Sequence, residues 1–171
     1  MTPEALEPFC AGIVADDCEI AEPSRHLRRA DVRVRWRWAA AERVIAGTVW
    51  PGVDGEGLPG HIHGGLLAAV LDEAMGWACW MNGYAAPGAS TQVHFRAPAR
   101  PGDALDLRAW LERSDGRTLM LCAELRNTAG VVASATGHYI AMRPPNLAAF
   151  AGWPGAQRFA DLALRALAPI T

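Results

Sequence analysis

The sequence contains no lysine, because all 16 of its basic residues are arginine. Chemistry that needs a lysine amine, such as Schiff-base formation or phosphate binding by a Walker-type lysine, is therefore excluded. The basic residues are balanced by 18 acidic ones, which leaves a formal net charge of −2 over 171 residues. A chain without a basic excess lacks the electrostatic footprint of nucleic-acid binders, so we expect no nucleic-acid partner.

Cysteine and long apolar runs are also scarce. The four cysteines form no CxxC pair and no zinc-finger spacing, so we interpret them as reduced, mostly buried thiols. No apolar run approaches the ~18 residues of a membrane span, and the sequence opens with Glu4 close to its start, where a signal peptide carries positive charge. We therefore expect a cytoplasmic protein with no membrane partner.

The periodicity of the apolar residues predicts the α+β class. Residues 32–38 and 43–50 alternate apolar and polar positions and are expected to form a β-hairpin, followed by a glycine- and proline-rich loop over 51–60. Residues 66–81 have no proline and predict one long central helix, buried on most sides and ending near Asn82. Four more strands are expected at about 90–96, 105–113, 118–127 and 131–141.

This order predicts one helix wrapped by one curved antiparallel sheet of about six strands, and it argues against alternating βαβ folds. We divide the chain into an N-terminal helical extension (residues 1–30), the main domain (31–142) and a C-terminal linker and helix (143–171). An open sheet has edges that need pairing, so we expect an oligomer.

Polar residues are concentrated where the long helix begins. His61, His63, Gly64 and Gly65 precede the helix, and the unpaired N–H groups of a first helical turn, reached closely past glycine, suit an oxyanion. Two turns further on, Asp72 is a carboxylate on an apolar helix, so it is either satisfied structurally or used chemically. It shares its helical face with small residues that leave room for a ligand, namely Gly65, Ala68, Ala69, Gly76 and Cys79.

Other interpretations of these residues remain open. His61 and His63 are spaced for metal ligation on a strand, but no third ligand lies at an obvious spacing, so we predict no metal. Glu73 lies about 100° further around the helix and suits an ion pair or an interface. Tryptophans on the predicted strands suit the core or an interface, whereas Trp77 and Trp80 near the helix end are candidates for a pocket.

The residues around the start of the long helix resemble those of a known family. The segment PGHIHGGLLAAVLDEA at residues 59–74 resembles the hotdog-fold acyl-CoA thioesterases of the PaaI-like branch, within the 4-hydroxybenzoyl-CoA thioesterase superfamily. The His-Gly-Gly motif followed by an acid at this spacing is its signature, and the resemblance runs from about residue 30 to 142. It implies a hotdog fold and a homodimer joined edge to edge, with two active sites at the subunit interface. We expect this dimer to assemble into a tetramer.

The resemblance also implies roles for individual residues. The Gly64 N–H would polarise the thioester carbonyl, His63 would hold that turn, and Asp72 of the other subunit would act as general base or as nucleophile. Several relatives place an asparagine six residues before the histidine, where this chain has Gly57, a departure that bears on the carbonyl contact and on the substrate class. Substrate-binding roles are expected for Gly65, Ser90, Thr91, His61 and Trp77.

The expected activity is hydrolysis of a medium-chain or aromatic acyl-CoA to the free acid and CoA, with no cofactor beyond the coenzyme A of the substrate itself. The aromatic preference is suggested by Trp77 and Trp80. Two alternatives stay open. One is a hotdog enoyl-CoA hydratase or dehydratase, which pairs a histidine with an acid in a loop context absent here. The other is a non-catalytic acyl-thioester-binding protein, against which Asp72 argues, because a binder gains nothing from a costly carboxylate.

Overall fold

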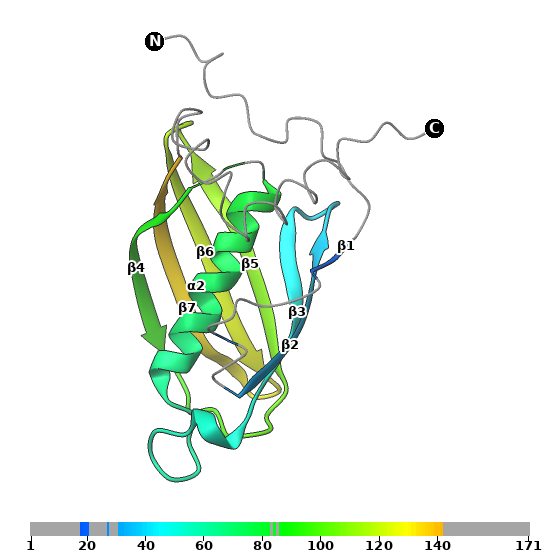
Figure 1. Cartoon of the computed structure of the whole chain (residues 1–171), viewed down its shortest axis with the longest axis vertical. Helices are drawn as coiled ribbons and strands as arrows, with labels where there is room; N and C mark the ends of the chain where they lie inside the picture. Colours follow the sequence, from blue (N-terminus) through cyan, green and yellow to red (C-terminus); the bar gives the residue numbers. More distant parts are fainter. Residues whose placement is uncertain (1–17, 21–26, 28–30, 83, 85, 142–171) are drawn as a thin grey trace, which may run out of the picture.

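The computed structural model describes residues 18–20, 27, 31–82, 84 and 86–141. In this part of the chain, the helix α2 (Gly64–Met81) lies across one face of an antiparallel sheet of seven strands (Figure 1). A short 3-10 helix, η2 (Val53–Gly55), lies in the loop before α2. The strands are β1 (Cys18–Ile20), β2 (Val32–Ala39), β3 (Val44–Pro51), β4 (Gly88–Phe95), β5 (Leu105–Ser114), β6 (Thr118–Asn127) and β7 (Gly130–Ile140).

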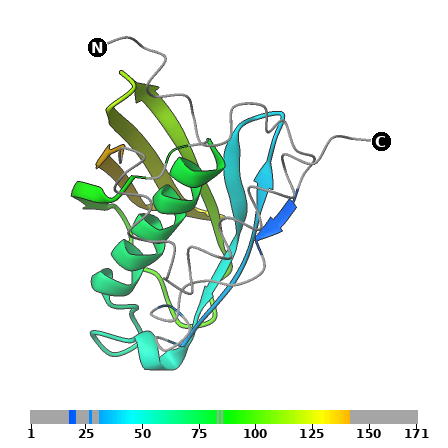
Figure 2. The ribbon, with the colours of Figure 1, turned by 45° about the horizontal axis from the view of Figure 1, so that its top comes forward.

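The strand order in the sheet is β1-β2-β3-β5-β6-β7-β4. The chain leaves β3 through η2 and α2 and returns as β4 at the far edge, beside β7, so that the helix connects strands that are not neighbours. The sheet curves around α2 (Figure 2). All six predicted strands and the long helix are confirmed, with boundaries shifted by about one or two residues, and the predicted arrangement of one helix against one antiparallel sheet is correct.

The seventh strand was not predicted. Within the extension of residues 1–30, where we expected a helix and a link, Cys18–Ile20 forms β1 and pairs antiparallel with β2, Cys18 opposite Trp38. Three residues are too few to show a periodicity, so the sequence held no signal for this strand. The helix expected at the start of the N-terminal extension and the one expected within 143–171 lie outside the described residues.

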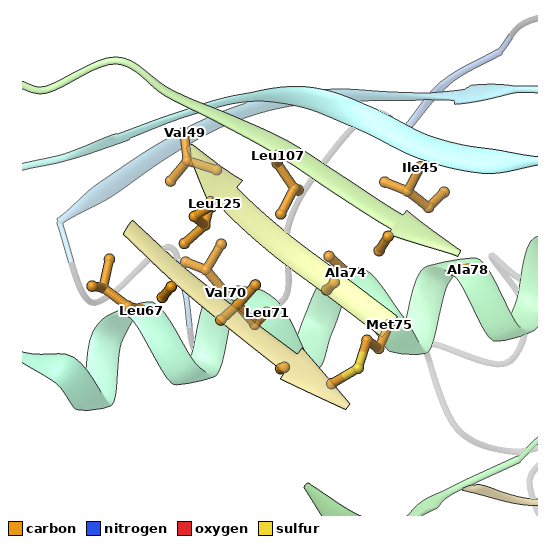
Figure 3. Packing of buried hydrophobic residues seen from close by; sticks show 14 of the residues in the cluster. Ile45, Val49, Leu67, Val70, Leu71, Ala74, Met75, Ala78, Leu107 and Leu125 are labelled. Carbon is orange, nitrogen blue, oxygen red and sulfur yellow. The ribbon is translucent and has the colours of Figure 1, made fainter. Parts of the chain in front are cut away.

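The core lies between α2 and the sheet (Figure 3). Strand β6, the first half of β5 and most of β7 bury alternate residues, as the period of a strand facing a core requires. The helix buries one stripe, and not most of its sides as expected, since Ala68, Ala69 and Gly76 are half-buried. The stripe repeats in pairs every four residues: Leu66 and Leu67, Val70 and Leu71, Ala74 and Met75, Ala78 and Cys79.

The C-terminal end of α2 is fixed to the turn between β2 and β3. Asn82 caps the helix, and its side-chain N–H donates to the Ala78 carbonyl at 2.8 Å. The Arg43 Nε–H donates to the Asn82 side-chain oxygen at 3.0 Å. These bonds hold the helix against the sheet at the end remote from the glycine motif. Among the described helices, none combines the length and the apolar character that a membrane span requires.

The first predicted strand has the two faces that its alternation indicated. Trp36 and Trp38 are buried at 2% exposure, whereas Arg33, Arg35 and Arg37 are exposed. Arg33 also stacks over the ring of Trp50 on the neighbouring strand, 4.4 Å from its centroid, a cation–π contact.

Candidate active site

His63 is the N-cap of α2 and accepts hydrogen bonds from most of the backbone N–H groups of the first turn. The Gly65 N–H donates to the His63 Nδ1 at 2.9 Å, and the N–H groups of Leu66 and Leu67 both point to the His63 carbonyl, at 2.9 and 3.4 Å. Within the described part of the chain, the Gly64 N–H is the one donor of this turn without an acceptor. An oxygen atom that approaches the helix end therefore meets a single free N–H, that of half-buried Gly64.

The glycines around His63 make room for its imidazole. A Cβ on Gly65 would lie 2.8 Å from the His63 Nδ1, so the capping bond requires glycine at this position. Because Nδ1 accepts this bond, the neutral ring carries its proton on Nε2 and presents an N–H there. Gly65 was expected to bind substrate, and its N–H is already occupied by the cap.

Gly57, at the position where relatives carry asparagine, packs against the same histidine. A Cβ there would lie 2.8 Å from the His63 Cδ2 and 3.2 Å from its Cα. The loop is closed by backbone bonds from the Gly57 N–H to the His61 carbonyl and from the His63 N–H to the Gly55 carbonyl, at 2.9 and 2.8 Å. In this conformation of the loop, a side chain at position 57 would overlap His63.

Asp72 lies in the middle of α2, and its carboxylate accepts hydrogen bonds from two hydroxyl groups. Thr91 of β4 donates to its Oδ1 at 3.2 Å, and Tyr139 of β7 donates to the same oxygen at 3.2 Å. The helix was expected to be buried on most sides, but Asp72 is exposed in the single chain, because it lies outside the buried stripe of the helix. Beside it, a Cβ added to Gly76 would meet no atom within 4 Å, so open space adjoins the carboxylate as predicted.

The structure distinguishes the two hydroxyls proposed for β4. Neighbouring residues of a strand point to opposite faces, and Thr91 contacts Asp72, so Ser90 points away from that carboxylate. A register shift between Gly88 and Ser90 sets this parity, with Ala89 as the extra residue. Thr91 pairs with Gly137 and Phe95 with Ala133, and the ring of Phe95 lies near Gly64, so the helix-facing residues of β4 follow α2 from its middle to its start.

Tyr139 was missed by the analysis of the sequence. It is 3% exposed, and its burial first, then the neighbouring Asp72 carboxylate, raises the pKa of its hydroxyl well above the ordinary value, so the hydroxyl keeps its proton. The one available signal was the alternation of β7, which places Tyr139 on the buried face where its hydroxyl needs a partner. The identity of that partner, on a helix 67 positions earlier, carries no local signal.

The remaining candidates lie away from this carboxylate. His61 is exposed, and its Nδ1 lies 3.0 Å from the Pro59 carbonyl in the loop. Trp77 is half-buried and packs against the core cluster, roughly 140° around the helix from Asp72. Cys79, expected on the face of Asp72, is fully buried in the stripe, and this burial raises the pKa of its thiol to about 12. No three His, Cys, Asp or Glu side chains of the described residues form a metal-binding group.

The separation of Gly64 and Asp72 limits what one chain can do. They are eight residues apart on one helix, so their positions differ by roughly 12 Å along its axis. Attack on a carbonyl requires the reacting atoms to lie about 3 to 3.5 Å apart. A carbonyl bound about 3 Å from the Gly64 nitrogen is too far from Asp72 of the same chain for this. The two halves of the predicted site therefore do not meet within a single chain.

Residues 59–134 match the family model described as the thioesterase superfamily. This segment, which runs from the loop before α2 into β7, is similar to that superfamily. A curated relative, the bovine (Bos taurus) acyl-coenzyme A thioesterase THEM4, is 30% identical over 91 residues, which cover 52% of this chain and 37% of that protein. A solved structure described as a thioesterase superfamily protein is 29% identical with a TM-score of 0.60, and covers 63% of this chain and 53% of that one.

More distant structures confirm the fold. The phenylacetic acid degradation protein PaaI from Thermus thermophilus, in a mutant form, is 23% identical with a TM-score of 0.61, and covers 70% of this chain and all of that one. A thioesterase-like protein from Streptococcus pneumoniae, whose structure includes coenzyme A, is 17% identical with a TM-score of 0.56, over 58% of this chain and 79% of that one. The curated match spans little more than a third of the bovine protein.

Proposed function

We propose that this protein hydrolyses an acyl-CoA thioester to a carboxylic acid and CoA. The observation that carries the proposal is that α2 presents two different groups. Gly64 has a free N–H, and Asp72 has a carboxylate that accepts hydrogen bonds from two hydroxyls. An N–H aimed at a developing oxyanion and a carboxylate beside open space are what acyl transfer to water requires. The match to the thioesterase superfamily model and the coenzyme A in a solved structure with this fold support the same substrate class.

In this proposal the Gly64 N–H donates to the thioester carbonyl oxygen. With Asp72 as general base, the carboxylate takes a proton from water while the water oxygen bonds to the carbonyl carbon, the C–S bond breaks, and the proton passes to the departing thiolate. With Asp72 as nucleophile, its oxygen bonds to that carbon and the thiolate leaves, and water then cleaves the mixed anhydride, regenerating the carboxylate. The geometry is compatible with both routes.

The site is proposed to form between two copies of the chain, because Gly64 and Asp72 are too far apart within one copy. The edge strand β4 offers the surface: it is exposed along most of its length, and its outer edge pairs with no described strand. Such an edge suits pairing with a second copy about a two-fold axis. The tetramer, the cytoplasmic location and the medium-chain or aromatic preference expected from Trp77 and Trp80 stay predictions.

Thiol release from short, medium, long and aromatic acyl-CoAs tests the activity. We expect turnover of at least one substrate and its loss in Asp72→Asn by ~10²-fold or more, as for a lost base or nucleophile. Glu73→Gln, which neutralises the adjacent acid, is the matched control and should keep the activity. If acyl-CoA binds but no thiol is released, the protein is a non-catalytic binder. Hydration of an enoyl-CoA without thiol release would point to the hydratase alternative.

Mixed dimers test the shared site. Chains carrying Asp72→Asn are combined with chains carrying Gly64→Pro, which removes the Gly64 N–H. In a two-fold dimer that shares its sites, half the dimers are mixed and each has one intact site, so about a quarter of the unaltered activity should return. Activity no greater than that of the two separate variants would contradict a site built from two chains.

A further inference from the structure

The tyrosine behind Asp72 makes two contacts with that residue. The Tyr139 hydroxyl lies 3.2 Å from the Asp72 Oδ1 and 3.3 Å from the Asp72 backbone carbonyl. The ring itself is buried between the sheet and α2, with 3% of its surface exposed. A buried hydroxyl needs a partner, and here that partner is the residue proposed to carry the chemistry.

The two carboxylate oxygens of Asp72 have different surroundings. Oδ1 accepts from both Thr91 and Tyr139, whereas Oδ2 accepts no hydrogen bond from any of the described residues. Asp72 itself is exposed, and the next turn of the helix offers open space at Gly76. Oδ1 is thus held by two hydroxyls of the sheet, whereas Oδ2 of this exposed residue has no partner among the described residues.

The sheet is adapted to the tyrosine ring. A Cβ on Gly137 would lie 2.7 Å from the Tyr139 Cε2 and 3.2 Å from the Met75 side chain, so the ring depends on glycine at that position. On the neighbouring strand, a Cβ on Gly88 would contact the ring at 3.5 Å and the Asp72 Oδ1 at 3.9 Å. Two glycines on adjacent strands therefore clear the path by which the hydroxyl reaches the carboxylate.

We infer that Tyr139 is a positioning residue for Asp72: with Thr91 it fixes Oδ1 and so assigns Oδ2 as the oxygen that attacks the thioester or takes the proton from water. This inference rests on the proposed thioesterase function. A carboxylate held by one donor rotates about its terminal bond more freely than one held by two, and loss of orientation lowers the rate of the chemical step. Substrate affinity does not depend on this contact, since the hydroxyl is buried behind the carboxylate.

The test compares Tyr139→Phe with Tyr84→Phe in the full-length chain. Tyr84 is the chain's other tyrosine, so the control removes the same atom elsewhere. We expect kcat of Tyr139→Phe to fall about tenfold with KM changed less than twofold, because a hydrogen bond to a charged group is lost while the ring stays in place. Tyr84→Phe should keep both constants, and thermal unfolding and size-exclusion chromatography check that both variants fold and associate alike.

The outcomes distinguish failure of the positioning role of Tyr139 from failure of the proposed thioesterase function. A kcat of Tyr139→Phe within twofold of the unaltered chain, or a rise in KM alone, would overturn the positioning role while leaving the thioesterase intact. Absence of turnover by the unaltered chain with every substrate would overturn both. If Tyr139→Phe does not fold, Thr91→Val removes the other donor from an exposed position, and an unchanged kcat in that variant would refute the assignment of Oδ1 as the held oxygen.

Discussion

Replacing Gly64 by proline removes one hydrogen-bond donor and little else. Gly64 is the first residue of α2, where proline is well tolerated because its fixed φ suits the helix and its missing N–H has no partner within the helix. The preceding residue, His63, has φ −63 and ψ 131, which is the extended conformation that a residue before proline prefers. The backbone therefore accommodates the substitution without a change in the cap.

Gly64→Ala is the control that isolates the donor. Both variants add a Cβ, which would lie 3.1 Å from the Cζ of Phe95. Phe95 is 55% exposed, so its ring can move aside at small cost. Alanine keeps the N–H and proline does not, so the ratio of their rates measures the contribution of that single donor.

The expected ratio follows from the count of free donors. Because Gly65, Leu66 and Leu67 use their N–H groups within the helix cap, the Gly64 N–H has no substitute in the first turn. Loss of one oxyanion donor costs about 10² to 10³ in kcat, or roughly 3 to 4 kcal/mol. Thiol release from the best acyl-CoA measures this ratio, with urea unfolding as the check on stability. A proline variant that matches the alanine variant would refute the role of the Gly64 N–H.

Three further predictions concern stability. Gly57→Ala should lower the free energy of unfolding by about 1 to 3 kcal/mol in urea titrations, because its Cβ would overlap the His63 ring. Gly76→Ala is the control and should not lower it, because a Cβ there meets no atom within 4 Å. His63→Ala should cost about 1 kcal/mol through the lost cap, and His63→Asn, a good N-cap residue, should recover most of it by the same measurement. Burial raises the pKa of Cys79 from 9.0 to about 12. The contribution of this thiol to stability is therefore complete below pH 9 and is lost as the pH rises from there toward 12. The urea midpoints at about pH 8 and pH 10.5 should differ less in Cys79→Ala than in the unaltered chain, and an equal difference in both would contradict the shift.

Local patterns were sufficient to predict the elements and their order. The alternation in residues 32–38, the glycine- and proline-rich loop and the uninterrupted helix were each a signal of short range, and they yielded the sheet and its helix. The motif from His63 to Asp72 was likewise visible, because its spacing lies within one helix and fixes the relative placement of the two residues.

Contacts between distant segments could not be predicted in this way. The sequence shows Asp72 and Tyr139 separately, but their meeting depends on how β7 lies under α2. The exposure of Asp72 and the burial of Cys79 also depend on which stripe of an almost uniformly apolar helix faces the sheet, and composition does not decide that. The role of Gly57 is visible only once the loop is folded against His63.

The extra residue in β4 bears on which changes in chain length the domain can tolerate. Gly88 pairs with Tyr139 and Ser90 with His138, so Ala89 is accommodated outside the regular ladder. Deletion of Ala89 would leave a regular register in which Thr91 still faces Asp72. A deletion between Thr91 and Phe95 would instead reverse the faces of every residue on one side of it, and separate the contact at Asp72 from the one at Gly64. Insertions and deletions are therefore expected to be tolerated at the start of β4 and to abolish function a few residues later.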